Sequence, residues 1–232
     1  MREAFEHELV GIRDRLIEMA VKAGAAMSTA TQAMLDADLQ SAQAVIAGDD
    51  ELDDLTGRIE QACYDTVARQ QPVARDLRLV VSAMQISSSL ERMGDLADHV
   101  AKLARMRHPR ASVPADVQPM FAQMGAVADQ MATGLASLLR SWDLAEASEI
   151  LALDDQMDQV HRDLFTAVLA PTWTHGVRAA IDTTLMSRYY ERYADHAVDV
   201  ARRVIQLVTG EPFSQTGTTG SASEPAGGGS PR

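Results

Sequence analysis

The strongest constraint on the fold of this chain is an internal duplication. The segment LERMGDLADHVAKL at residues 90–103 returns as YERYADHAVDVARR at residues 190–203, at an offset of 100 residues. A second repeat, made of aspartates, runs at an offset of 105 residues from Asp49 to Asp154. Because the acids recur at matching positions in both copies, the sequence predicts two similar halves that each carry an acidic site.

The composition favours helices packed on helices. Of the 232 residues, 46 % are hydrophobic and only 4 % are aromatic, so Leu, Val, Ala and the 12 Met must fill the core. This mixture suits helix packing better than a β-sandwich or barrel. The net charge of −12 argues against non-specific nucleic-acid binding, which needs a positive surface to displace counterions.

The same inspection favours a cytoplasmic protein. Cys63 is the only cysteine, so no disulfide forms within the chain, as is usual in a reducing compartment. The charged start MREAFEHELV has no apolar signal core. Uncharged runs reach only about a dozen residues, short of the ~20 needed to cross a bilayer. We therefore expect a protein that is peripheral to the membrane only through its partners.

Apolar residues at three- and four-residue steps predict six long helices. The expected helices cover residues 3–47, 50–70, 73–107, 116–146, 153–170 and 174–209. A short carboxylate can accept hydrogen bonds from the free N–H groups of a first helical turn. Asp49 or Asp50 is therefore expected to cap the second helix, and Asp154 lies near the expected cap of the fifth.

These elements define the fold class. No strand is predicted, because β-branched residues are scattered and no Asn-Gly or Asp-Gly turn separates alternating runs. The expectation is an all-α protein of two tandem bundles, each with three long antiparallel helices, over residues 1–108 and 116–210. The segment from 211 to 232 is rich in Gly, Ser, Thr and Pro and predicts a disordered tail.

The acids of each copy fall on helical faces. Glu91 and Asp95 share one face of their expected helix, since each residue advances about 100° around the axis. Apolar residues fall roughly opposite them: Met93, Leu96, Val100 and Leu103. Glu191 and Asp195 form the matching stripe in the second copy. The upstream pairs Asp49/Asp53 and Asp154/Asp158 are each four residues apart, so each pair can also converge.

Two interpretations of these stripes compete. A single acidic stripe is typical of a solvated face whose ion pairs contribute ~0.3–0.5 kcal/mol each. Two matched sets of crowded carboxylates instead predict cation binding, because like charges four residues apart repel until something neutralises them. Hard oxygen ligands suit Mg, Mn, Ca or ferric iron, and a histidine such as His99 would also tolerate zinc. Extension of the stripes adds His99 and Asp199 as further candidate ligands.

Two three-helix halves that each close with Glu-Arg-x-Gly/Ala-Asp resemble the PhoU family of phosphate-uptake and phosphate-signalling regulators. The resemblance covers residues from about 1 to 210, that is, everything except the tail. It implies a cytoplasmic, often homodimeric protein that is not an enzyme. Such a protein is a negative regulator of phosphate uptake and starvation signalling, an adaptor between the phosphate ABC transporter ATPase and a sensor histidine kinase.

The resemblance also implies metal sites. Some family members carry multinuclear iron or zinc clusters at paired E(D)xxxD motifs. These motifs map here onto the residues Asp49, Asp53, Glu91 and Asp95 in the first half, and Asp154, Asp158, Glu191 and Asp195 in the second. Metal identity varies in the family, so Mg and Mn stay open as alternatives.

Two other functions remain as alternatives. One is a structural helical module with ion-paired surfaces and no metal. The other is a carboxylate-bridged di-metal enzyme, which typically carries Glu-x-x-His on two helices with the acids pointing inward. The nearest match, Asp158 with His161, has no twin. The small-residue run GAAMSTATQAML at 24–35 permits close helix approach and would also suit a dimer interface.

Overall fold

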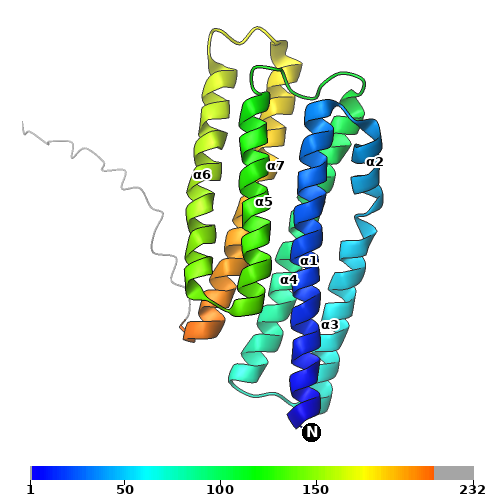
Figure 1. Cartoon of the computed structure of the whole chain (residues 1–232), viewed down its shortest axis with the longest axis vertical. Helices are drawn as coiled ribbons and strands as arrows, with labels where there is room; N and C mark the ends of the chain where they lie inside the picture. Colours follow the sequence, from blue (N-terminus) through cyan, green and yellow to red (C-terminus); the bar gives the residue numbers. More distant parts are fainter. Residues whose placement is uncertain (1, 212–232) are drawn as a thin grey trace, which may run out of the picture.

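The computed structural model describes residues 2–211 as an all-α protein, which confirms the predicted fold class. Figure 1 shows long helices that run side by side along one axis. The helices are α1 (Arg2–Asp36), α2 (Leu39–Ala47), α3 (Asp50–Gln70), α4 (Arg75–Arg107), α5 (Gln118–Ser141), α6 (Leu144–Leu169) and α7 (Gly176–Thr209). The predicted disordered tail lies, from residue 212 on, outside the described residues.

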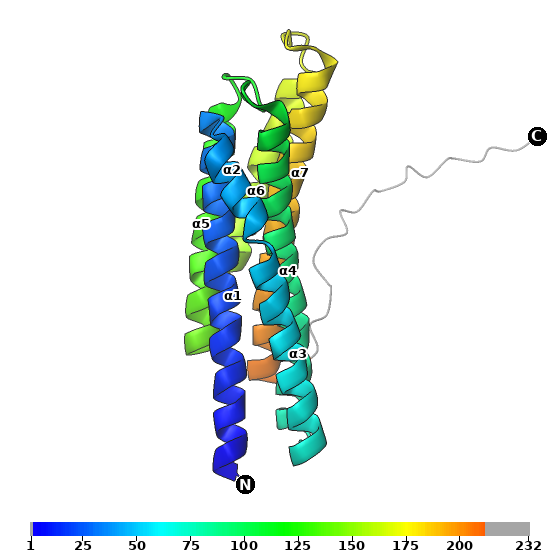
Figure 2. The same ribbon diagram turned by 90° about the vertical axis from the view of Figure 1, so that its right-hand side faces the viewer.

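The two halves pack side by side and share one core. In Figures 1 and 2, α1 and α5 form the front of the bundle and α4 and α7 the back, with α3 on one flank and α6 on the other. Helix α1 packs on both α4 and α5, and α4 packs on α7, so helices of different halves are in direct contact. The buried hydrophobic residues form a cluster that runs through all seven helices. A hydrogen bond of 2.6 Å between the buried hydroxyls of Thr31 and Tyr190 also joins α1 to α7.

Two of the expected helix boundaries are wrong. The expected helix 3–47 breaks at Ala37, which has a φ of +53°, and α2 starts after Asp38. The expected helix 116–146 ends at Ser141, and α6 begins at Leu144 instead of residue 153. In both places an aspartate caps the new helix. The Asp38 carboxylate accepts hydrogen bonds from the backbone N–H groups of residues 40 and 41, and Asp143 accepts one from residue 145.

The expected caps at the acidic motifs are also wrong. Asp49 immediately precedes α3, but its side chain makes no capping hydrogen bond. Asp154 lies well inside α6, which continues without a break where the first half is interrupted at Gly48. The repeated aspartates thus divide into two roles, since Asp38 and Asp143 cap helices and Asp49 and Asp154 do not.

The small residues of α1 pack against α5 of the same chain. A methyl group added at Gly24 would lie 2.6 Å from the Cβ of Ala132, and one at Gly125 would lie 2.6 Å from the Cγ2 of Thr31. These close approaches bring α1 and α5, and therefore the two halves, into tight contact.

The described part of the chain contains no helix that is both long and apolar enough to cross a membrane.

Candidate functional site

Helices α4 and α7 run antiparallel along the back of the bundle and set the acids of the two halves level with each other. Three contacts fix their register. Arg203 donates to the side-chain oxygen of Gln85 (2.5 Å), and the rings of His99 and Tyr189 lie 5.3 Å apart. Arg107 donates two hydrogen bonds to Asp182, of 2.6 and 2.8 Å. This register places residue 94 beside residue 194, at the centre of both acidic motifs.

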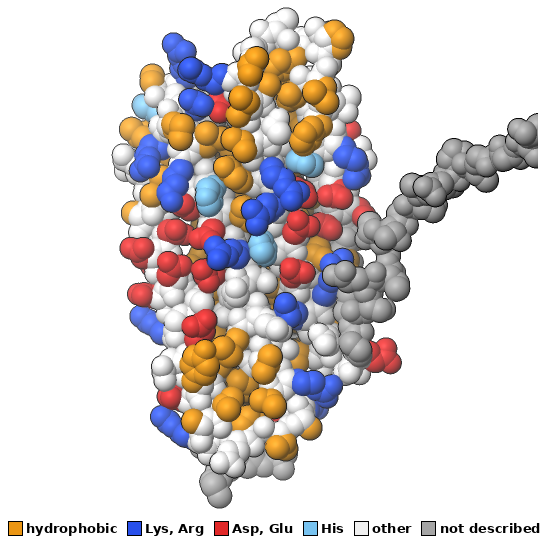
Figure 3. Space-filling view, turned by 180° about the vertical axis from the view of Figure 1, so that it is seen from behind, with side chains coloured by type: hydrophobic (Ala, Val, Ile, Leu, Met, Phe, Trp, Pro, Cys, Tyr) orange, Lys and Arg blue, Asp and Glu red, His pale blue; other side chains and the backbone are white. Residues whose placement is uncertain are grey.

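Figure 3 shows the result on the back of the molecule. Asp and Glu side chains gather at mid-height on both sides of this face, with Arg and His side chains between them. The group from α3 and α4 is the first acidic cluster, and the group from α6 and α7 is the second. The first contains Asp49, Asp53, Glu91 and Asp95. The second contains Asp154, Asp158, Glu191 and Asp195.

The residues of the first acidic cluster influence one another electrostatically. Burial raises the pKa of Asp49, and the negative charges of Asp98, Asp95 and Asp53 raise it further. Burial likewise raises the pKa of Glu91, against the opposing effect of Arg92. The structure therefore brings acids from α3 and α4 together.

Basic side chains partly neutralise the first acidic cluster. Arg92 donates to the Asp95 carboxylate at 2.6 Å, and Lys102 pairs with Asp98. Asp98 is buried with one carboxylate oxygen, Oδ1, that lacks a hydrogen-bond partner. A Cβ added at Gly94 would lie 2.3 Å from a methyl carbon of Leu52, so the glycine lets α3 pack closely on α4 beside the acids.

The second acidic cluster contains the carboxyl whose pKa is raised furthest, that of Asp154. Burial, then the charges of Asp158 and Asp195, raise the pKa of Asp154 to about 6. Burial also raises the pKa of Glu191, and the charge of Asp195 adds to this effect. One carboxylate oxygen of Glu191 pairs with Arg188, while the other is buried without a hydrogen-bond partner. Such an oxygen is costly to bury alone and is suited to bind a cation.

The two extensions of the stripes differ in placement. His99 is exposed, and its Nδ1–H donates to the backbone carbonyl of Asp95 on its own helix (2.6 Å). Asp199 borders a cavity of about 310 Å³. The other residues that line this cavity are Asp154, Asp195, Arg192, His196, Val198 and Arg202. His196 was not among the predicted site residues, although its position next to Asp195 was a usable signal.

The carboxylate oxygens of both clusters suit a hard cation, but the side chains are not drawn together around a common point. Crowded carboxylates with raised pKa values are stabilised when a cation binds between them. No group of three His, Cys, Asp or Glu side chains is arranged to hold a metal ion anywhere within residues 2–211. A bound cation would therefore require the carboxylates of neighbouring helices to turn toward one another.

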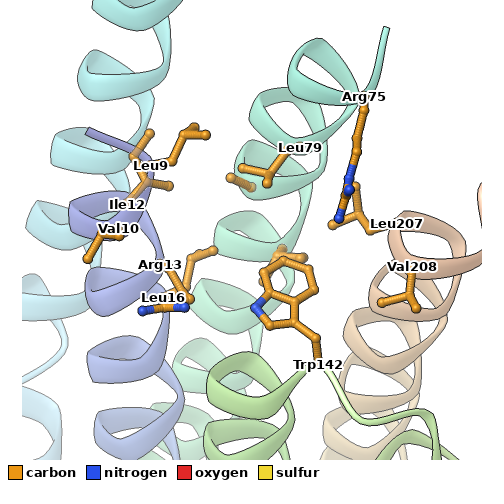
Figure 4. A pocket seen from close by; sticks show the side chains of 12 residues that line it. Leu9, Val10, Ile12, Arg13, Leu16, Arg75, Leu79, Trp142, Leu207 and Val208 are labelled. Carbon is orange, nitrogen blue, oxygen red and sulfur yellow. The ribbon is translucent and has the colours of Figure 1, made fainter. Parts of the chain in front are cut away.

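Sequence reasoning missed an apolar groove of about 360 Å³ where the two halves meet at the lower end of the bundle. Figure 4 shows Leu9, Ile12 and Leu16 of α1 on one side and Leu207 and Val208 of α7 on the other, with the Trp142 ring between them. The groove contains none of the predicted site residues.

Comparison with known proteins agrees with the duplication. The family model described as the PhoU domain matches residues 16–104 and again residues 121–204. A protein of Mycobacterium tuberculosis named phosphate-specific transport system accessory protein PhoU homolog 2 is 48 % identical over 210 residues. The match covers 90 % of this chain and 99 % of that protein. PhoU homolog 1 of Mycobacterium leprae is 46 % identical over 210 residues, which cover 90 % of this chain and 95 % of the relative.

Solved structures agree as well. The crystal structure of PhoU from Pseudomonas aeruginosa superposes with a TM-score of 0.79 at 28 % identity, over 89 % of this chain and all of that one. The regulatory protein PhoU from Streptococcus pneumoniae shares the fold with a TM-score of 0.82 at 24 % identity, over 90 % of this chain and 99 % of that one. With its two matched domains, its fold and its paired acidic motifs, this chain belongs to the PhoU family.

Proposed function

We propose that this protein is a non-enzymatic negative regulator of phosphate uptake and phosphate-starvation signalling. It acts in the cytoplasm as an adaptor between the phosphate ABC transporter ATPase and the sensor histidine kinase, as a homodimer that reaches the membrane only through these partners. The relatives' printed name, accessory protein of the phosphate-specific transport system, supports the transporter side of this role. The observation that carries the proposal is the pair of acidic clusters on one face of a PhoU-family fold.

Metal binding is the second part of the proposal. Asp49, Asp53, Glu91 and Asp95 would hold one set of ions, with His99 as a possible nitrogen ligand. Asp154, Asp158, Glu191 and Asp195 would hold the other set, with Asp199 beside it. Iron or zinc is the proposed metal, and Mg or Mn would satisfy the same oxygen donors. The bound charge would neutralise the clusters and so change how this face meets a partner.

The direction of the acids favours a surface role over catalysis. The apolar residues Met93, Leu96, Val100 and Leu103 are buried, so Glu91 and Asp95 point away from the core. The histidine of the one Asp-x-x-His pair makes other contacts instead of facing a metal site. His161 hydrogen-bonds to Ser187 at 3.1 Å and packs against Phe165. An inward-facing di-metal centre of the bundle type has no counterpart in this arrangement.

The adaptor role is tested in cells and with purified partners. Deletion of the gene should derepress a phosphate-starvation reporter in phosphate-rich medium, and the intact chain should restore repression. Pull-downs from phosphate-replete and phosphate-starved cells should recover the transporter ATPase and the kinase. The proposal fails if neither partner is recovered and the reporter is unchanged. A chain ending at Gly210 should still bind, because the helical surface provides the contacts.

The metal part is tested by elemental analysis and thermal unfolding. Purified protein should carry stoichiometric metal, and removal by a chelator should lower the melting temperature. At a hundredfold excess of metal over Kd, the expected stabilisation is ~2.7 kcal/mol. Protein without metal whose melting temperature responds to none of the candidate ions would favour the metal-free helical module instead.

A further inference from the structure

The outward faces of α4 and α7 both change from apolar side chains near the start of the helix to acidic side chains further along it. Leu77 and Val81 lie in the first turns of α4 and are 40 % and 45 % exposed. Leu77 precedes Asp95 by 18 residues, or five full turns, so both fall on the same stripe. At the 100-residue offset, α7 carries Val177 and Ile181, which are 77 % and 53 % exposed. The duplication has therefore kept an exposed apolar patch as well as an acidic cluster.

Neighbouring helix ends and loops enlarge both patches. The lower patch consists of Tyr64, Val67, Val73, Leu77 and Val81, all at least 40 % exposed. The upper patch consists of Phe165, Leu169, Val177, Ile181 and Leu185, all at least 39 % exposed. Each patch is flanked by an arginine at an equivalent position, Arg78 below and Arg178 above. Exposed apolar side chains scattered singly need no explanation, but groups of this size mark interaction sites.

The antiparallel register puts the two patches at opposite ends of the same face. Residues 94 and 194 are level, and each patch lies about 15 residues from that point, so the patches are about 45 Å apart. Figure 3 shows the two groups of hydrophobic side chains toward the top and bottom of the back face, with the acidic clusters between them. A pseudo-two-fold axis through the α4–α7 crossing relates one patch to the other.

The upper patch is hollowed, as a docking surface for side chains should be. A cavity of about 560 Å³ lies there, lined by Val168, Trp173 and the outward side of α7. Helix α4 is covered by α1, α2, α3 and α7, and α7 by α4, α5 and α6, so within residues 2–211 the back is the side of each helix that no other helix covers. Both patches are thus available to a partner at the same time.

We infer that the back face docks a homodimeric protein whose own two-fold axis meets the α4–α7 crossing, with one partner subunit on each apolar patch. This inference rests on the proposed adaptor function and specifies which partners it suits. The partner presents two copies of an apolar element about 45 Å apart and a basic surface between them. One chain then engages two subunits, and each contact raises the effective concentration of the other.

Charge argues against a second copy of this chain as the occupant. A two-fold contact through the back face would place acidic clusters against acidic clusters, on chains that each carry a net charge of −12. Like charges brought together in this way repel. A basic partner surface is complementary to the same clusters.

The test uses the full chain and, as probes, the purified transporter ATPase dimer and the dimeric cytoplasmic part of the kinase. Val81→Arg and Ile181→Arg change equivalent, exposed positions of the two patches. Val21→Arg is the matched control, since Val21 is 55 % exposed on α1, beside α5 at the front. Circular dichroism and melting temperature verify folding, calorimetry gives Kd, and light scattering gives the stoichiometry.

For at least one probe we expect, at saturation, one partner dimer on each back face, so that a homodimer of this chain binds two partner dimers. Each single patch variant should weaken binding by about 100-fold, the two losses should be similar, and the double variant should not bind. Val21→Arg should bind like the wild type. The inference is overturned if both patch variants bind normally, if one abolishes binding while the other is neutral, or if two chains bind each dimer. Wild-type protein that binds neither probe would overturn the proposed function itself.

Discussion

The two acidic clusters have the same motif acids but different counter-charges. In the first, Lys102 pairs with the buried Asp98, and Asp49 stands at a break between two helices. In the second, residue 198 is a valine and Asp154 lies inside an unbroken helix with a pKa of about 6. Duplication thus preserved the acids and let their surroundings diverge. The same motif can therefore give two sites of unequal charge.

A second difference concerns the contact between the halves. The buried Asp182 and the partly exposed Arg107 form a pair with two hydrogen bonds between α4 and α7. The equivalent positions at the other end of the crossing are Leu207 and Ser82, which cannot form such a pair. This ion pair therefore joins α4 to α7 at the upper end, and the duplicated positions at the lower end cannot repeat it.

The largest expected effect comes from removing this pair. Arg107→Ala should reduce the free energy of unfolding more than any other variant considered below, because it leaves the buried Asp182 carboxylate without its partner. Urea unfolding monitored by circular dichroism measures the change. The double variant Arg107→Ala/Asp182→Leu should recover part of the loss. An unchanged free energy of unfolding in the single variant would contradict the importance of this contact.

Metal content tests whether the clusters are independent. Replacing Glu91 and Asp95 by Ala should lower the bound metal by about half, and replacing Glu191 and Asp195 should do the same, since each pair serves one of two sites. Elemental analysis of the purified variants gives the ratio. Complete loss from either pair, or no change, would show that the clusters do not act as two separate sites.

The pH dependence of stability should distinguish the clusters. The pKa of Asp154 is about 6 in the folded protein against 3.8 in the reference state, so the folded state holds this proton more tightly. The stability from this group is fully present below about pH 4 and is lost as the pH rises through 6. Asp154→Asn should therefore stabilise the metal-free protein at pH 7 by about 1 kcal/mol.

Chemical unfolding at pH 4.5 and pH 7 in the presence of a chelator measures this effect. The matched variant Asp49→Asn should gain less, because the Asp49 carboxyl is less deeply buried than the Asp154 carboxyl and burial is the main cause of the raised pKa in both. Equal gains in the two variants would mean that the clusters are electrostatically alike.

The smallest expected effect concerns the helix caps. Asp38→Ala should cost about 1 kcal/mol and Asp143→Ala about 0.5 kcal/mol. The difference arises because Asp38 accepts two backbone N–H groups and the Ser41 hydroxyl, whereas Asp143 accepts one backbone N–H group. Thermal unfolding of both variants makes the comparison, and the reverse order would contradict it.

Much of the fold was predictable because it is local. The expected helix ends at residues 70, 170 and 209 agree with the observed ends at Gln70, Leu169 and Thr209. The break at Ala37 was not predicted, since the apolar steps of α1 continue smoothly into α2 and only the Asp38 cap marks the boundary. The unpredicted start of α6 has the same cause, because only the Asp143 cap marks that boundary.

Spacing predicted which acids share a helix face, but it did not predict their surroundings. Spacing placed Glu91 with Asp95 and Glu191 with Asp195 on outward faces, and both pairs lie on the back of the bundle. Spacing did not show that Asp98 is buried, or that one oxygen of Glu191 lacks a partner. Both features depend on neighbouring helices, which periodicity along one helix does not describe.

The sequence alone determined the helical class, the duplication and the alignment of acids along each helix, because these depend on periodicity within short segments. Tertiary structure decided the rest. Packing of α4 against α7 set the register that brings residues 94 and 194 level and sends the apolar patches to opposite ends. Burial and counter-charges depend on contacts between segments far apart in the sequence, such as residues 85 and 203 or 107 and 182, so they emerge only when those segments meet.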